Sequence, residues 1–371
     1  MSLIHRLSTL ALVVAAIVFG EIRPTAAQSA TAVNRGVVEL ETTGSTGISV
    51  RIAEDLANLI DDGSTRRLLP VIGKGSLQNV TDLKYLRGID IAILQADVLD
   101  FARDQRLLPG LESSITYITK LYNEEFHLLA RSDIRSIADL ENQNVNLDLR
   151  SSGTAITASR VFDALKLKVN PVYDSQQVAL EKLRRGEIAA IAFVAGKPAP
   201  LFGGITETDR FHLLDVPYKS TPASAYAPTR LTSTDYPLLV PRDRPVDTIA
   251  VGSILAAADL RQIPDRYQNT VNFIDAFFTG FQSLLGPGYH PKWQEVSLAA
   301  EVPGWRRHPA AEQWLQRNLQ VSRIPDPEVL KGMFSQFIDQ RRQAAHGEPM
   351  TEQEKAALFQ QFQVWRDRQG R

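Results

Sequence analysis

The 371-residue chain contains no cysteine, and this absence removes several kinds of chemistry at once. Without thiols there can be no disulfide, thiolate-bound metal, iron–sulfur cluster or cysteine nucleophile. Histidine is also scarce, at six residues, and no two histidines stand at the spacing of a metal-binding pair. We therefore expect neither a metal nor any other cofactor.

An excess of charge of either sign is missing as well. Lys and Arg number 41 against 42 Asp and Glu, which gives a formal net charge of −1. Such a chain has no broad positive field with which to hold nucleic acid. Its apolar share of 44% and charged share of 22% are typical of globular proteins, and its length favours two domains.

One apolar run stands out, over residues 7–19, and it is too short to cross a bilayer, which takes about 20 apolar residues as a helix. Arg6 precedes this run, and small residues at 25–27 follow it. These are the features of a secretory signal, so residues 1–27 are predicted to be a signal peptide that is removed on export to the periplasm. The alternative is an uncleaved anchor or an apolar N-terminal helix.

Apolar strands alternate with amphipathic helices in the first third of the chain. Residues 37–41, 68–72 and 89–94 are predicted strands, and a helix is predicted after each of the first two. This alternation is typical of a parallel sheet with helices on both faces. We therefore expect a first α/β lobe over residues 34–116.

A second series of the same kind predicts a second α/β lobe over residues 120–218. Its predicted strands are residues 115–118, 126–130, 145–149, 188–194 and 212–216. The turn-rich segment 217–228 is predicted to cross back, so that residues 225–324 complete the first lobe. Each lobe is expected to have a sheet of its own.

Aromatic amphipathic helices are predicted in the C-terminal part of the chain. One covers residues 266–285 and carries four Phe. Pro327 begins a second helix, and Thr351 with Glu354 forms the capping box of a third. Residues 325–371 are therefore predicted to be a helical extension whose aromatic faces pack on the body of the protein. The alternative is a docking surface for a partner.

Motifs of the common enzyme classes are absent. The chain has no G-x-x-x-x-G-K-[ST], no G-x-S-x-G and no H-E-x-x-H. The carboxylate pairs Asp61-Asp62 and Glu124-Glu125 stand on loop-like segments without a partner histidine. We expect both pairs to be solvated surface residues, and the protein not to be an enzyme.

Small polar loops stand where predicted strands end and helices begin. They are residues 43–47, 75–76, 95–97, 150–154 and 193–196. In parallel α/β sheets, ligands bind at the carboxyl ends of the strands, where helix N-termini offer free N–H groups and a partial positive charge. The loops of both lobes therefore predict one shared binding site. For any single Ser or Thr, the simpler alternative is a helix N-cap.

The candidate ligand-binding residues come from these loops. They are Ser45, Thr46, Ser76, Gln95, Arg150, Ser151, Ser152, Thr154 and Phe193. Arg150 directly follows an apolar strand, so it is predicted to bind a solute carboxylate through two parallel hydrogen bonds. The alternative is that Arg150 makes a surface ion pair.

Four segments within about residues 39–202 stand in a distinctive order and spacing. They read TTGSTGISVRIAEDLANLI, GKGSLQNVTDLKYLRGIDIAILQADV, LLARSDIRSIADLENQNVNLDLRSSGTAITASRVFDALKL and AFVAGKPAPLF. In this order they resemble the TAXI family of TRAP-transporter solute receptors. The resemblance implies an α/β fold of two lobes, the periplasmic-binding-protein type II fold. It also implies that a small organic acid or amino acid is captured and delivered to a TRAP-type membrane permease. We expect the protein to be a monomer.

Two other functions stay open on the sequence alone. The same lobes suit an exported binding protein that reports to a sensor or assists assembly, and they suit an enzyme on the same scaffold. Fold alone does not decide among the three, although the missing acid–base pairs count against the enzyme.

Overall fold

The computed structural model describes residues 36–45, 47–218, 226–321 and residue 334. Within these residues ten strands form one sheet, in the order β2-β1-β3-β10-β4-β7-β5-β6, while β8 pairs with β4 and β9 with β10. The strands are β1 (Val37–Thr42), β2 (Arg67–Ile72), β3 (Ile91–Gln95), β4 (Ile115–Arg131), β5 (Asn144–Asn146), β6 (Asn170–Val172), β7 (Ala190–Ala195), β8 (Phe211–Leu213), β9 (Tyr226–Leu231) and β10 (Val246–Ala258).

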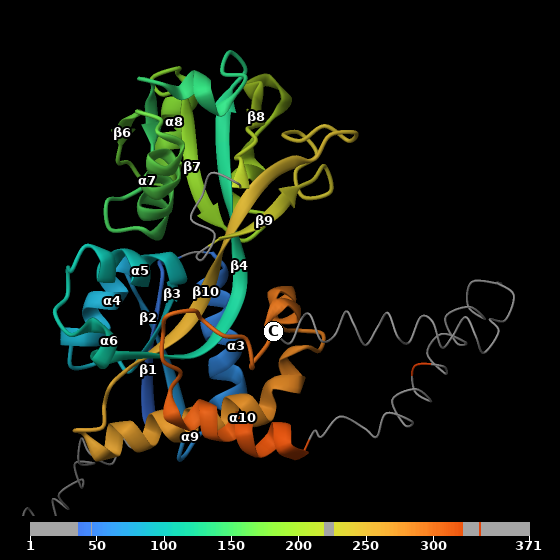
Figure 1. Ribbon diagram of the computed structural model, residues 1–371. Helices are drawn as coiled ribbons and strands as arrows, with labels where there is room; N and C mark the ends of the chain where they lie inside the picture. Colours follow the sequence, from blue (N-terminus) through green and yellow to red (C-terminus); the bar gives the residue numbers. More distant parts are fainter. Residues whose placement is uncertain (1–35, 46, 219–225, 322–333, 335–371) are drawn as a thin grey trace, which may run out of the picture.

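Helices gather on this sheet in two groups, and the molecule therefore has two lobes (Figure 1). The first lobe carries α3 (Ile48–Ile60), α4 (Ser76–Tyr85), α5 (Ala96–Asp104), α6 (Leu111–Ser114), α9 (Pro264–Leu284), α10 (Pro309–Val321) and the 3₁₀ helix η5 (Pro291–Glu295). The second lobe carries α7 (Gly153–Leu165), α8 (Gln176–Arg184) and the 3₁₀ helices η1 (Ile137–Leu140), η2 (Pro200–Gly204) and η3 (Glu207–Asp209).

The core of the first lobe lies between α3, α9 and the parallel strands β1, β2 and β3. Ile52 and Leu56 recur at helical spacing in α3, and both are fully buried. Helix α9 confirms the helix predicted at 266–285, and its Phe277 ring makes edge-on contacts with Phe278 and Trp293. This aromatic cluster fixes the helices that lie farthest from the second lobe.

The second lobe repeats the α/β pattern on the other half of the sheet. Strand β5 is parallel to β7, and the two overlap the predicted strands 145–149 and 188–194. Strand β6, which no apolar run predicts, is also parallel to β5. Ala158 and Phe162 of α7 are buried with residues of β7 in one core cluster. Ser136 caps η1, and Asp139 completes the capping box.

The expectation of two separate sheets is wrong, because β4 and β10 run through both lobes (Figure 1). The segments predicted as strands 115–118 and 126–130 are one strand of 17 residues. Its polar middle, around Asn123, stays extended because β10 pairs with it there. Hydrogen bonding to a partner strand thus overrides the local polar signal.

The expected return to the first lobe near residue 225 is also wrong. Tyr226 and Leu231 of β9, with Val246 and Val251 of β10, belong to the core of the second lobe. The reason is an antiparallel hairpin in which Val251 pairs with Tyr226 and Val246 with Leu231. The chain re-enters the first lobe along β10, where Ile254 joins a first-lobe cluster.

The predicted signal peptide, residues 1–27, lies outside the described residues, as does the predicted extension 325–371 apart from residue 334. None of the helices that the structure describes has the length and apolar character needed to span a membrane.

Phe277→Ala is expected to lower the free energy of unfolding by about 3–5 kcal/mol, because the ring is fully buried among other aromatics and its loss leaves a cavity. The measurement is urea unfolding followed by circular dichroism. The control is Leu238→Ala at a half-exposed position, which should change the free energy by less than about 0.5 kcal/mol. Equal effects of the two substitutions would contradict the packing described here.

Candidate functional site between the lobes

A cavity of about 1110 Å³ opens between the two lobes. Residues of both lobes line it, and they come from the strand ends and helix starts that face the gap. The lining includes Thr43, Ser45, Gly47, Ile48, Lys74, Gly75, Ser76, Gln95, Glu124, Asp148, Ser151, Ser152, Gly153, Thr154, Ser175, Gln176, Phe193 and Gly196. All five of the predicted polar loops contribute to this surface.

Four helices have their first residue in the cavity wall: α3 and α4 from the first lobe, α7 and α8 from the second. The N-cap positions of α3 and α4 are Gly47 and Gly75, which have no side chain to cap the helix. Ser175 precedes α8 and also makes no side-chain cap. The first N–H groups of these helices have no intrahelical acceptor, so they are available to a ligand.

Gly75 is required at its position for two reasons. Its φ of 122° is a backbone conformation that side chains disfavour. A Cβ there would also lie 2.8 Å from the backbone oxygen of Ser151, across the cleft. The start of α4 therefore approaches the second lobe as backbone.

The two lobes touch at the same place through side chains. The Ser151 hydroxyl donates to the Lys74 carbonyl oxygen at 3.3 Å. A Cβ on Gly153 would overlap Oε1 of Gln95, so the start of α7 rests directly on the Gln95 side chain.

Gln95 and Glu124 form a buried pair where β3 and β4 pass the cavity. Nε2 of Gln95 donates to Oε2 of Glu124 at 2.7 Å, and the main-chain N–H of Gln95 donates to Oγ of Ser76 at 3.3 Å. Only 7% of Glu124 is exposed. Burial is the main cause that raises the pKa of Glu124 to about 7, against the lowering effect of the Gln95 hydrogen bond.

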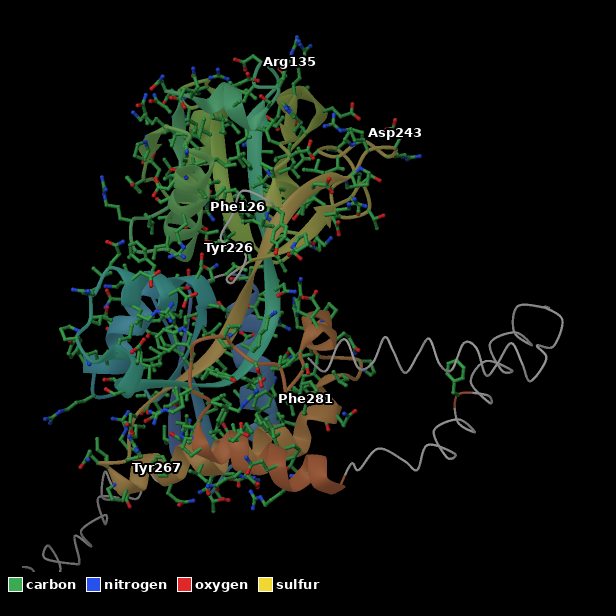
Figure 2. The ribbon with its side chains drawn as sticks, viewed as in Figure 1. Phe126, Arg135, Tyr226, Asp243, Tyr267 and Phe281 are labelled. Atoms are coloured by element: carbon green, nitrogen blue, oxygen red, sulfur yellow. The ribbon has the colours of Figure 1, made fainter. Side chains whose placement is uncertain are left out.

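A second buried carboxylate ties the lobes together beside the cavity. Asp97 of α5 accepts hydrogen bonds from Thr157 of α7 at 2.6 Å and from the Tyr226 hydroxyl at 2.9 Å. Figure 2 shows Tyr226 near the junction of the lobes. Burial raises the pKa of Asp97 in spite of these two donors.

Seven of the nine predicted binding residues line the cavity: Ser45, Ser76, Gln95, Ser151, Ser152, Thr154 and Phe193. Some of their hydroxyls already have backbone partners. The Ser152 hydroxyl caps α7 by accepting from the N–H of Ala155, and Oγ1 of Thr154 accepts from the N–H of Val194. Ser152 therefore acts as a helix N-cap, and Thr154 supports the main chain of β7. Ser45 is exposed and lines the cavity. Thr46 lies outside the described residues.

Arg150 does not line the cavity, so the geometry does not support its predicted role as the carboxylate anchor. Strand β5 ends at Asn146, and Asp148 adopts a left-handed φ of 66°, which turns the chain before Arg150. The exposed guanidinium then lies over the ring of Tyr173, 3.9 Å from its centroid. A cation–π contact with Tyr173 is the interaction that the structure shows for Arg150, and its role as an anchor stays a prediction.

The expectation that Glu124 and Glu125 are solvated surface residues is wrong, because both are buried. Oε2 of Glu125 accepts from the N–H of Lys197 at 2.9 Å, and Oε1 lies 3.4 Å from Nζ of Lys292. The sequence contains one indication of this burial. The polar residues here lie between two apolar segments, and all of them belong to the single strand β4.

Sequence reasoning also missed the start of α8. Gln176 lines the cavity and is buried, with Nε2 donating to the Ala192 carbonyl at 3.1 Å. In the part of the chain that the structure describes, no three His, Asp or Glu side chains are placed to hold a metal ion. Buried His127 is engaged with Tyr236, whose hydroxyl lies 2.7 Å from Nε2.

The strand order, the two strands shared by the lobes and the cavity between them confirm the expected α/β architecture of two lobes. The model of the NMT1-like family matches residues 40–268, more than half of the chain. The protein therefore belongs to the NMT1-like family.

Several solved structures are similar to this one. The alkanesulfonate-binding protein SsuA from Xanthomonas axonopodis pv. citri, bound to MOPS, has 14% identity and a TM-score of 0.41, covering 82% of this chain and 93% of its own. The periplasmic binding protein BugD has 14% identity and a TM-score of 0.44, with 76% and 93% covered. A TctC solute binding protein from Polaromonas has 16% identity and a TM-score of 0.39, with 67% and 88% covered.

Thr157→Val is expected to lower the free energy of unfolding by about 1–3 kcal/mol, because Asp97 then keeps only one of its two donors while it stays buried. Thermal or urea unfolding measures this change. Thr81→Val is the matched control, since the Thr81 hydroxyl donates only to the Leu77 carbonyl within α4. A loss no larger than that of the control would show that the Asp97 contact does not join the lobes energetically.

Proposed function

We propose that the protein is a receptor that captures a small organic anion or amino acid between its lobes and releases it chemically unchanged. One observation carries this proposal: four helices begin in the wall of a single cavity, and none of them has an acidic residue in its first turn. The other four described α-helices each have one, namely Asp97 in α5, Glu112 in α6, Asp265 in α9 and Glu312 in α10.

This distribution of charge suits an anion. A helix N-terminus carries about half a positive charge, which an Asp or Glu in the first turn would neutralise. The helices that begin at the cavity keep that charge, and three of them lack a side-chain cap as well. A carboxylate in the cavity would therefore receive several main-chain hydrogen bonds that no first-turn Asp or Glu of these helices takes up.

Closure of the lobes around the solute is part of the proposal. The starts of α4 and α7 lie against the opposite lobe through Gly75 and Gly153, where no side chain holds them apart. Strands β4 and β10 join the lobes and are the natural hinge (Figure 1). Closure would bury the solute and strengthen its hydrogen bonds, because water is excluded.

The narrower assignment is that the protein is a TAXI-type receptor, exported to the periplasm after removal of residues 1–27, and that it delivers its solute to a TRAP-type permease. The order of the polar loops along the chain supports this assignment. It is also supported by the signal-like N-terminal segment.

The test is to purify the protein from cells that export it, to release bound molecules by denaturation and to identify them by mass spectrometry. We expect a small carboxylate-bearing molecule in near-stoichiometric amount, which then binds the emptied protein in calorimetry. Loss of the gene should abolish uptake of that molecule by the cells. Normal uptake without the gene would contradict delivery to a permease, and conversion of the molecule by the protein would contradict the receptor.

Gly153→Ala is expected to weaken binding of the identified solute by about tenfold or more. A Cβ at this position displaces the Gln95 side chain from its hydrogen bond with Glu124 and keeps the lobes apart. Calorimetry gives the affinity. The control is Gly203→Ala in η2, where a Cβ meets no atom within 4 Å, and it should leave the affinity unchanged. Equal affinities of both variants and the wild type would contradict closure at Gly153.

A further inference from the structure

We propose that Glu124, held in place by Gln95, is the subsite for a positively charged amino group, so that the solute is an amino acid or a similar zwitterion. This inference rests on the receptor function proposed above and narrows its solute to one of the two classes. In this proposal, Glu124 is the residue that distinguishes an amino acid from the corresponding acid without an amino group.

The first argument is the position of the carboxylate. Glu124 lines the cavity at the point where β4 passes between the lobes. Its Oε2 accepts from Gln95, while no donor among the described residues bonds to Oε1. One oxygen of a nearly buried carboxylate is therefore left for a ligand in the cavity.

The second argument is that Glu124 has no counterion. Among the described residues no Lys, Arg or His forms a salt bridge with it. Lys292 is the nearby cation, and its Nζ is already shared by Glu125 at 3.4 Å and Glu295 at 2.7 Å. Asp97 and Glu125 add further negative charge around Glu124. A buried carboxylate without a partner is costly, and a solute ammonium would supply the missing charge.

The third argument is an excess of acceptors. The amide of Gln95 turns its NH₂ toward Glu124, whose carboxylate only accepts when it is ionised. Oε1 of Gln95 has no hydrogen-bond partner but is covered by Gly153, so the acceptor that this pair offers to the cavity is the Glu124 carboxylate. Groups that only accept suit an ammonium, which offers three donors, better than a carboxylate, which offers none.

The cavity thus has two chemically opposite regions. The starts of α3, α4, α7 and α8 offer N–H donors and partial positive charge, whereas Glu124 offers acceptor oxygens and negative charge. A plain organic anion would satisfy only the first region. A zwitterion satisfies both, with its carboxylate at the helix starts and its ammonium at Glu124.

Proton exchange gives an independent signature of this arrangement. The pKa of Glu124 is raised to about 7, chiefly by burial. Glu125 and Asp97 also raise this pKa and Lys292 lowers it, while the charge of Glu124 in turn raises the pKa of Tyr122. Near pH 7 this raised pKa leaves a fraction of Glu124 protonated in the free protein. An ammonium favours the ionised form, so binding of a zwitterion releases this proton. An added carboxylate would instead favour the protonated form and cause proton uptake.

The experiment compares two panels of probes on the ligand-free full chain. One panel is the twenty L-α-amino acids, and the other is the corresponding 2-hydroxy acids, in which a hydroxyl replaces the ammonium. We expect at least one amino acid to raise the melting temperature and to bind in calorimetry about a hundredfold more tightly than its hydroxy acid. Calorimetry at pH 7 in buffers of different ionisation enthalpy should show proton release on binding.

The decisive variant is Glu124→Gln, which keeps the shape and the hydrogen bond from Gln95 but removes the charge. It should bind the amino acid about ten- to a hundredfold more weakly, bind the hydroxy acid as the wild type does, and release no proton. Since burial disfavours the charged form, this variant should fold at least as well as the wild type. The control is Glu41→Gln, which removes another buried carboxyl with a raised pKa, one that does not line the cavity. It should leave the affinity unchanged.

The outcomes separate this inference from the receptor function. If a hydroxy acid or another anion without an amine binds as tightly as its amino acid, the Glu124 subsite is wrong and the receptor stands. The same conclusion follows if Glu124→Gln changes amino acid affinity by less than threefold, or if binding takes up protons. If neither panel binds and no small molecule accompanies the purified protein, both proposals fail.

Discussion

The structure depends on one constraint: two strands, β4 and β10, belong to both lobes and pair with each other along the crossing. Side chains at the crossing cannot move away from the gap between the lobes without breaking the sheet. Glu124 is therefore held at the cavity, with Gln95 of neighbouring β3 beside it. The strand ends that open into the cavity, and the helices that follow them, are placed by the same sheet. The proposed hinge and the wall of the cavity thus come from a single set of main-chain hydrogen bonds.

Much of the fold could be predicted from the sequence, because its signals are local. Apolar runs gave the parallel strands β1, β2 and β3, and helical spacing gave α3 and α9. The length of β4 and the place of β9 could not be predicted, because they depend on pairing between residues far apart in the chain. Tyr226 pairs with Val251, and Glu125 with Ala250. By local pattern alone, the polar residues Asn123, Glu124 and Glu125 would end a strand. Pairing with β10 keeps them extended.

The candidate site could be predicted as a set of loops but not as a set of contacts. Strand ends in a parallel sheet meet at one edge, so loops from both lobes were expected at one cavity. The direction of Arg150 depends on the left-handed turn at Asp148 and on Tyr173, neither of which an apolar pattern reveals. The role of Glu124 depends on burial, which converts a common surface residue into a carboxyl group with a raised pKa.

Charge, not capping, sets the helix starts at the cavity apart. Helices α6 and α9, away from the cavity, also lack a side-chain cap, but each has an acidic residue in its first turn, whereas α3, α4, α7 and α8 have none. A glycine at the N-cap costs only about a few tenths of a kcal/mol relative to Ser, Thr, Asn or Asp, whereas a buried polar atom without a partner costs about 1–3 kcal/mol. Helices α3 and α4 begin after such glycines, so their first N–H groups stay free without a large cost to the fold. In the proposed receptor, a solute carboxylate accepts from these groups once the lobes have closed around it, and the hydrogen bonds formed only in that state are what favours closure.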